Sequence, residues 1–117
     1  VTGTYRFYGR IYYDASTVAD IQVAFTFPAV AANGAKWGML GRNDGTATQI
    51  KANVATASGT AISAGGNGVG TSTFLDFDGF INITATGNLV TQYAQGTSEA
   101  TNLTVQFGSW LEVTKVV

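Results

Sequence analysis

Apolar and other side chains alternate with a period of two residues through much of this chain. Over residues 5–13, one face of such a pattern collects Tyr5, Phe7, Gly9, Ile11 and Tyr13. The same period recurs over residues 21–27 and 74–84, and no window has the period of a helix. Because successive side chains point to opposite faces of a strand, the pattern predicts an all-β protein.

Turn-forming residues separate the alternating segments, at residues 14–17, 33–34, 42–45 and 87–88. The turn at 42–45 predicts a hairpin between a short strand at 37–40 and a weakly alternating edge strand at 46–56. The glycine-rich residues 59–73 predict a long, mobile loop. About eight strands at short spacing predict one antiparallel β-sandwich over residues 1–117, and a jelly roll is the arrangement they favour.

The balance of charge excludes several classes of partner. Charged residues make up 11% of the chain and the net charge is −1, with no cluster of Lys and Arg. Binding to nucleic acid or to a membrane surface needs such a cluster, so neither is expected. No apolar stretch is long enough to span a bilayer. Threonine, serine, asparagine and glycine supply the polar surface instead, which favours packing against copies of the same chain.

The chain has no histidine and no cysteine, which removes the commonest nucleophilic, acid–base and metal-binding constellations. Asp76 and Asp78 are the one obvious acidic pair, about 7 Å apart on one strand face. Such a pair could serve a glycosidase or bind Ca²⁺, but a solvated sheet face, or charge that discourages edge pairing, is the simpler interpretation. We expect no catalytic residue, no cofactor and no metal site.

The strand predicted at residues 5–13 has large side chains on both faces. Arg6, Tyr8, Arg10 and Tyr12 lie opposite the apolar face, and the C-terminal residues 108–117, which include Trp110, also carry large groups on both sides. A strand of this kind usually packs against other parts of a protein on both of its faces. Tyr, Trp and Arg are enriched at protein interfaces. These residues predict a subunit interface. The alternatives are half-exposed sheet tyrosines or a platform on which sugar rings stack.

Several short motifs resemble one family of domains. They are Gly3-Thr4-Tyr5-Arg6-Phe7, Tyr13-Asp14-Ala15-Ser16-Thr17, Ala19-Asp20-Ile21, Leu89-Val90-Thr91-Gln92-Tyr93-Ala94-Gln95 and Gly108-Ser109-Trp110-Leu111-Glu112-Val113. The chain resembles the C-terminal jelly-roll domain, similar in fold to tumour necrosis factor, of head-fibre, capsid-decoration and tail-fibre proteins of tailed bacteriophages. The likeness spans most of the chain, while residues 41–73 resemble the family only in the general kind of residues they contain. It implies a homotrimer with one sheet of each subunit facing a threefold axis, and packing and interface roles for Gln92, Gln95 and Trp110.

The function that this resemblance implies is a non-enzymatic structural protein on the virion surface, which decorates or stabilises the capsid. Its partners would be copies of itself and the major capsid protein or other virion proteins. One alternative is the tip of a tail fibre, or a receptor-binding domain that touches a host glycan. Another is a carbohydrate-binding module with Tyr8, Tyr12 or Trp37 as the stacking platform and Asp76 and Asp78 as polar contacts. A glycoside-active enzyme using the two aspartates is the third.

Overall fold

The computed structural model describes residues 1–42 and 50–116 of the chain. Within these residues there are nine strands and no helix, as the alternation predicted. The strands are β1 (Gly3–Asp14), β2 (Ile21–Thr26), β3 (Val30–Arg42), β4 (Ile50–Ala55), β5 (Ile62–Ala64), β6 (Thr73–Ile83), β7 (Val90–Gln95), β8 (Thr104–Val105) and β9 (Trp110–Lys115). The described residues accordingly hold no helix that could cross a membrane.

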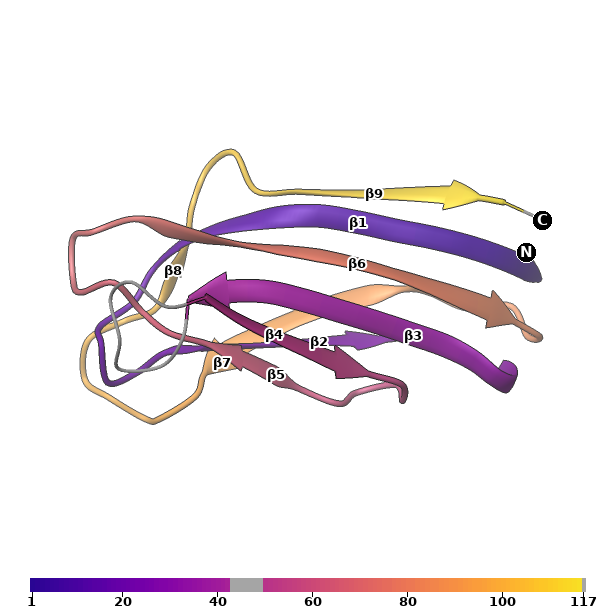
Figure 1. Ribbon diagram of the computed structural model, residues 1–117, viewed down its shortest axis with the longest axis horizontal. Helices are drawn as coiled ribbons and strands as arrows, with labels where there is room; N and C mark the ends of the chain where they lie inside the picture. Colours follow the sequence, from indigo (N-terminus) through magenta and orange to yellow (C-terminus); the bar gives the residue numbers. More distant parts are fainter. Residues whose placement is uncertain (43–49, 117) are drawn as a thin grey trace.

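The strands form two antiparallel sheets (Figure 1). The large sheet has the order β4-β3-β6-β1, and the far edge of β1 pairs with β8 near Tyr13 and with β9 from Tyr5 to Arg10. The small sheet has the order β5-β2-β7. Buried side chains from both sheets share one core, so the two sheets pack face to face.

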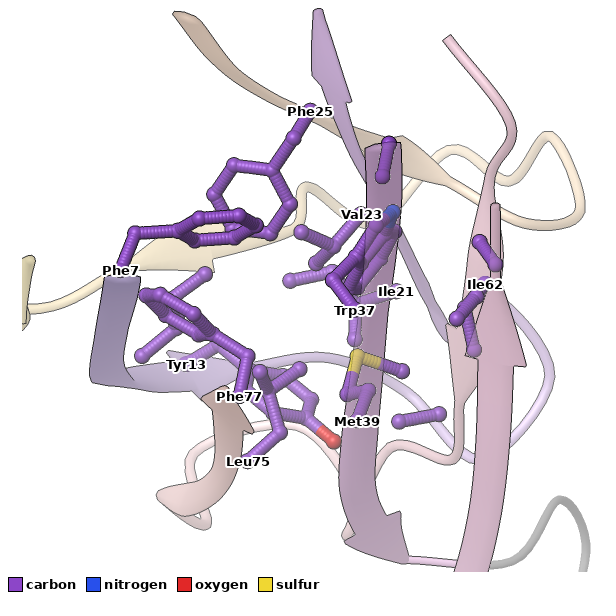
Figure 2. Packing of buried hydrophobic residues seen from close by; sticks show 14 of the residues in the cluster. Phe7, Tyr13, Ile21, Val23, Phe25, Trp37, Met39, Ile62, Leu75 and Phe77 are labelled. Carbon is purple, nitrogen blue, oxygen red and sulfur yellow. The ribbon is translucent and has the colours of Figure 1, made fainter. Parts of the chain in front are cut away.

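The inner faces follow the alternation read from the sequence. Phe7, Ile11 and Tyr13 of β1 are buried, as are Ile21, Val23 and Phe25 of β2. The Phe25 ring joins the two sheets, because its centroid lies 4.9 Å from that of Phe7, 4.8 Å from that of Trp37 and 4.9 Å from that of Phe77 (Figure 2). Aromatic pairs at this separation add stability beyond the area they bury.

Asn33 and Gly34 do not form the turn that the sequence predicted. They lie inside β3, where the pairing with β6 shifts register between Val30 and Ala35. Asn33 has a φ of 56°, a left-handed conformation that Asn tolerates better than most residues. The same property suits a tight turn and a β-bulge, and here it lengthens the predicted strand at residues 37–40 into β3.

The predicted long loop at residues 59–73 is interrupted by β5, whose residues Ile62–Ala64 pair with β2. The segment after β5 is tied to the rest of the fold rather than loose. The Tyr13 hydroxyl donates to the Gly65 carbonyl at 2.7 Å, and the Gly66 N–H donates to Asp20 Oδ1 at 3.1 Å. A short strand and these two hydrogen bonds therefore replace part of the predicted unbroken loop.

The predicted edge strand at residues 46–56 corresponds to β4, which lies at the edge of the large sheet. Residues 43–49, including most of the predicted turn at 42–45, lie outside the described residues.

Gly9 allows β9 to join the sheet. A Cβ atom at this position would stand 2.1 Å from the Trp110 carbonyl oxygen and 2.6 Å from Cζ of Phe77. Only a residue without a side chain fits between the core and the paired strand. Gly9 thus explains why a small residue interrupts the apolar face of β1.

Candidate functional site

The side of the large sheet that faces away from the small sheet is the candidate functional site, and we call it the outer face. Its side chains alternate with the core residues of the same strands. In the register of β1 with β6, Arg10 lies opposite Asp76 and Tyr12 opposite Phe74, and in that with β9, Tyr8 lies opposite Glu112 and Arg10 opposite Trp110. The large, charged and hollow-lining members of the outer face are Arg6, Tyr8, Arg10, Tyr12, Lys36, Gly38, Leu40, Arg42, Val54, Phe74, Asp76, Asp78, Phe80, Trp110, Glu112 and Val116.

Two ion pairs occupy the centre of the outer face. Arg10 binds Asp76 through two hydrogen bonds, Nε to Oδ1 at 2.6 Å and Nη2 to Oδ2 at 2.9 Å. Arg6 binds Asp78 in the same way, at 3.2 and 2.6 Å. Parallel double bonds of this kind fix the orientation of both groups. The four side chains form a ladder that is neutral overall.

This ladder changes the interpretation of the acidic pair. β6 lies between β1 and β3, so Asp76 and Asp78 do not protect a sheet edge. The hydrogen bond from Arg6 lowers the pKa of Asp78, whereas the general acid of a glycosidase needs a raised pKa. Each carboxylate is bound by an arginine. This geometry does not favour the use of Asp76 and Asp78 as the two carboxylates of a glycosidase.

Aromatic rings surround the ion pairs. The Arg10 guanidinium carbon lies 4.0 Å from the Phe74 ring centroid, and that of Arg6 lies 4.9 Å from the Tyr8 centroid. The Tyr8 and Trp110 rings meet edge to face at 5.8 Å. A hydrogen bond with Glu112 raises the pKa of Tyr8. Guanidinium groups stacked on rings and paired with carboxylates hold the surface in one arrangement.

The outer face exposes a large apolar area. Six of its large apolar side chains remain 40–66% exposed, and they are Leu40, Val54, Phe74, Phe80, Trp110 and Val116. Exposed apolar patches of this extent mark interaction sites in soluble proteins. Arg6 and Arg10 are each paired with an aspartate, while Lys36, Arg42 and Glu112 add charges of both signs.

A depression crosses the outer face at Gly38. One part has a volume of about 610 Å³ and is bordered by Tyr8, Arg10, Leu40 and Trp110. The adjoining part, about 540 Å³, is bordered by Arg6, Val54 and Phe80. A Cβ atom at Gly38 would come no closer than 3.4 Å to its neighbours. The missing side chain therefore leaves a hollow that a substitution could fill without strain.

The structure brings together five of the seven residues that the sequence singled out for an interface. Arg6, Tyr8, Arg10, Tyr12 and Trp110 all lie on the outer face.

The other two, Gln92 and Gln95, belong to β7 in the small sheet. Gln92 is exposed, while Gln95 donates to the Thr101 carbonyl at 2.5 Å and accepts from the Glu99 N–H. Gln95 thus shapes the turn after β7 and does not reach the outer face.

Sequence reasoning missed part of the site and misjudged one residue. Phe74 and Phe80 share a strand face with Asp76 and Asp78, but only the register with β1 places them beside Tyr12 and Arg6. Trp37, offered as a stacking platform, is 1% exposed and belongs to the core.

No cluster of metal-binding side chains is found among the described residues. Comparison of the chain with protein-family models, with curated proteins and with solved structures finds no match.

Proposed function

We propose that this chain is a non-enzymatic structural module of a bacteriophage virion, a jelly roll that forms homotrimers on the particle surface and decorates or stabilises the capsid. The main support for self-association is the outer face, where six half-exposed apolar side chains surround two ion pairs. The virion setting and the threefold symmetry rest on the family resemblance.

The size of the outer face suits a subunit interface. It is five strands wide, and β1 and β6 are in register over eleven residue pairs. The outermost strands β4 and β9 have six residues each, so at about 4.8 Å between strands and about 3.3 Å per residue the face covers about 710 Å². Stable interfaces bury about 800 Å² on each partner. One face of this sheet therefore offers an area close to that of a specific contact.

The charges of the outer face suit a copy of the same chain better than a charged partner. Arg6 and Arg10 are each paired with an aspartate, and Lys36, Arg42 and Glu112 add charges of both signs. A surface whose charges are mostly paired is not strongly repelled by its own copy, and it gives little net attraction for a polyanion.

The same face also favours a second candidate, a glycan-binding surface at a fibre tip or on the capsid. The depression beside Gly38 has aromatic walls from Tyr8 and Trp110, and polar groups from Arg10 and Asp76. Aromatic stacking together with fixed polar contacts is the usual chemistry of ligand recognition in an open site. The two functions compete for one surface, so one experiment separates them.

The test is the solution mass by light scattering across a dilution series, for the unaltered chain and two variants. Phe80→Glu places a charge in the middle of the outer face, and Val18→Glu makes the same change at a 60% exposed loop position. We expect a mass of three chains for the unaltered protein and Val18→Glu, and a lower mass for Phe80→Glu. A monomer in all three would refute self-association, and glycan-array binding lost in Gly38→Trp would then favour the second candidate.

The virion assignment has its own test, the number of copies in purified particles. A capsid module would be present in numbers that match the symmetry axes of the capsid, and a fibre tip in a few copies. Absence from phage particles would overturn the assignment while leaving the trimer intact.

A further inference from the structure

A second unpartnered surface lies between β9 and β7. Among the described residues, β9 pairs only with β1 and β7 only with β2. Each is therefore the last strand of its sheet, and Tyr93 of β7 and Leu111 of β9 border the same hollow. A terminal strand presents unpaired N–H and C=O groups along its free edge. We call the groove between these two edges the lateral seam.

Two adjacent hollows form the lateral seam. One, of about 250 Å³, is lined by Tyr93 of β7 and Leu111 of β9, with Ile11 and Phe77 among its lining residues. The other, of about 200 Å³, is lined by Leu89 and Val113, with Tyr5, Ile81 and Ile83 also lining it.

Leu111 and Val113 share the inner side of β9, yet they are 40% and 47% exposed. The small sheet ends at β7 and leaves them uncovered, so the sandwich is open along this side.

The spacing of the hollows matches an extended chain. Leu111 and Val113 are two residues apart on β9, which is about 7 Å. Alternate side chains of a strand added to β9 would have the same spacing and would point into the two hollows. Backbone bonds to a free edge, combined with pockets for alternate side chains, define recognition by strand addition.

The next inward position of β9 adds a charge to this pattern. Lys115 lies opposite Tyr5, with its Nζ 6.0 Å from the Tyr5 ring centroid, and it makes no ion pair with any described residue. An acidic side chain on the added strand would meet it there. The complementary segment thus has two apolar residues at alternate positions and an acidic residue at the next alternate position.

The printed sequence does not contain such a segment. None of its seven acidic residues has apolar residues at both the second and fourth positions before it, or at both the second and fourth positions after it. Residues 1–117 therefore offer a second copy no segment with the full pattern, and the partner is defined by its chemistry: an extended segment with two alternate apolar residues and an acidic one at the next alternate position.

We propose that the lateral seam binds an extended segment of another virion protein by strand addition to β9. The proposal rests on the proposed function only for the source of that partner. The seam adjoins the outer face at β9, because Trp110 lines hollows on both surfaces. Leu111 and Val113 point to the inner side of β9, which a contact made through the outer face does not cover. Strand addition would then attach the module to the particle.

A short peptide tests this directly. The probe is acetyl-Thr-Glu-Thr-Val-Thr-Val-Thr-amide, and the control has the same composition in the order Thr-Glu-Thr-Val-Val-Thr-Thr, which places the two valines on opposite faces. We expect saturable binding of the probe alone, with slower amide hydrogen exchange in β9 on binding. Equal binding of both peptides, or no change of exchange in β9, would overturn the proposal.

Charge reversal gives the matched control without disturbing the core, because Lys115 is exposed. Lys115→Glu is expected to weaken binding of the probe about fivefold at low salt. The same variant should bind a probe that carries Lys in place of Glu more tightly than the unaltered chain does. An unchanged preference would contradict the predicted role of Lys115.

The Phe80→Glu variant separates the two proposals. It is expected to bind the probe normally while failing to trimerise. Loss of peptide binding in a variant that is folded but monomeric would show that the groove forms only on assembly, against the inference drawn from the isolated chain.

Discussion

Replacement of Phe25 tests whether one ring holds the two sheets together. Phe25 is fully buried and contacts three other aromatic rings at centroid distances of 4.8–4.9 Å. Truncation of a buried Phe to Ala costs about 3–5 kcal/mol, and each aromatic pair adds about 0.5–1.5 kcal/mol beyond its area. We therefore expect Phe25→Ala to cost about 4–5 kcal/mol, and Phe25→Leu, which keeps most of the apolar burial, about 1–2 kcal/mol.

The assay is urea unfolding followed by far-UV circular dichroism, at one fixed chain concentration because association shifts the midpoint. With a slope of about 1–3 kcal/mol per molar urea, a loss of ~4 kcal/mol lowers the midpoint by roughly 1–4 M. Val18→Ala, at a position that is 60% exposed, is the control and should stay within about 0.5 kcal/mol of the unaltered chain. A cost below about 1.5 kcal/mol for Phe25→Ala would refute the claim that this ring joins the sheets.

Three further substitutions address β9, the glycine-rich segment and the ion-pair ladder. Gly9→Ala should push β9 away from β1 at a cost of about 1–3 kcal/mol, measured as faster amide exchange in β9; unchanged exchange would contradict the close packing. Tyr13→Phe leaves the Gly65 carbonyl without its 2.7 Å donor, and should cost about 1–3 kcal/mol and speed proteolysis at residues 65–70. Arg6 holds the pKa of Asp78 below its ordinary value of 3.8, so the stability from this carboxylate is complete above that value and lost as the pH falls through the folded pKa. The melting temperature of Asp78→Asn should therefore lie below that of the unaltered chain by a constant amount from about pH 7 to about pH 5, and the gap should close in stronger acid; a gap that widens in acid would contradict the ion pair.

Much of the local structure follows from the alternation of side chains. The inner faces of β1, β2 and β6 follow from this alternation, because the core residues of these strands recur at every second position. Because residues 5–13 carry large side chains on both faces, the sequence also predicted that Arg6, Tyr8, Arg10 and Tyr12 share a surface.

What the sequence could not give is the pairing between distant strands. Arg10 and Asp76 are 66 residues apart, and their ion pair depends on the register of β1 with β6. Sequence reasoning therefore treated Asp76 and Asp78 as a pair of carboxylates, when each has an arginine partner.

Two local errors have different physical causes. Asn33 adopts a positive φ that serves a turn and a bulge equally well, so its residue type did not distinguish them. The strand β5 covers only Ile62–Ala64, which is too short for a period of two residues to be recognised. It exists because the open edge of β2 accepts it, which is a tertiary effect.

The central claim is that the outer face of the large sheet is buried between copies of this chain. Since the chain has no cysteine, one introduced thiol can be labelled alone, and Gly38→Cys places it in the hollow of the outer face with room for the side chain. The most direct measurement is the rate of its reaction with a maleimide reagent at rising chain concentration, beside Val18→Cys as the exposed reference. The account predicts that Gly38→Cys becomes protected as the mass rises to three chains while Val18→Cys stays reactive. Equal reactivity of the two thiols in the assembled protein would contradict it.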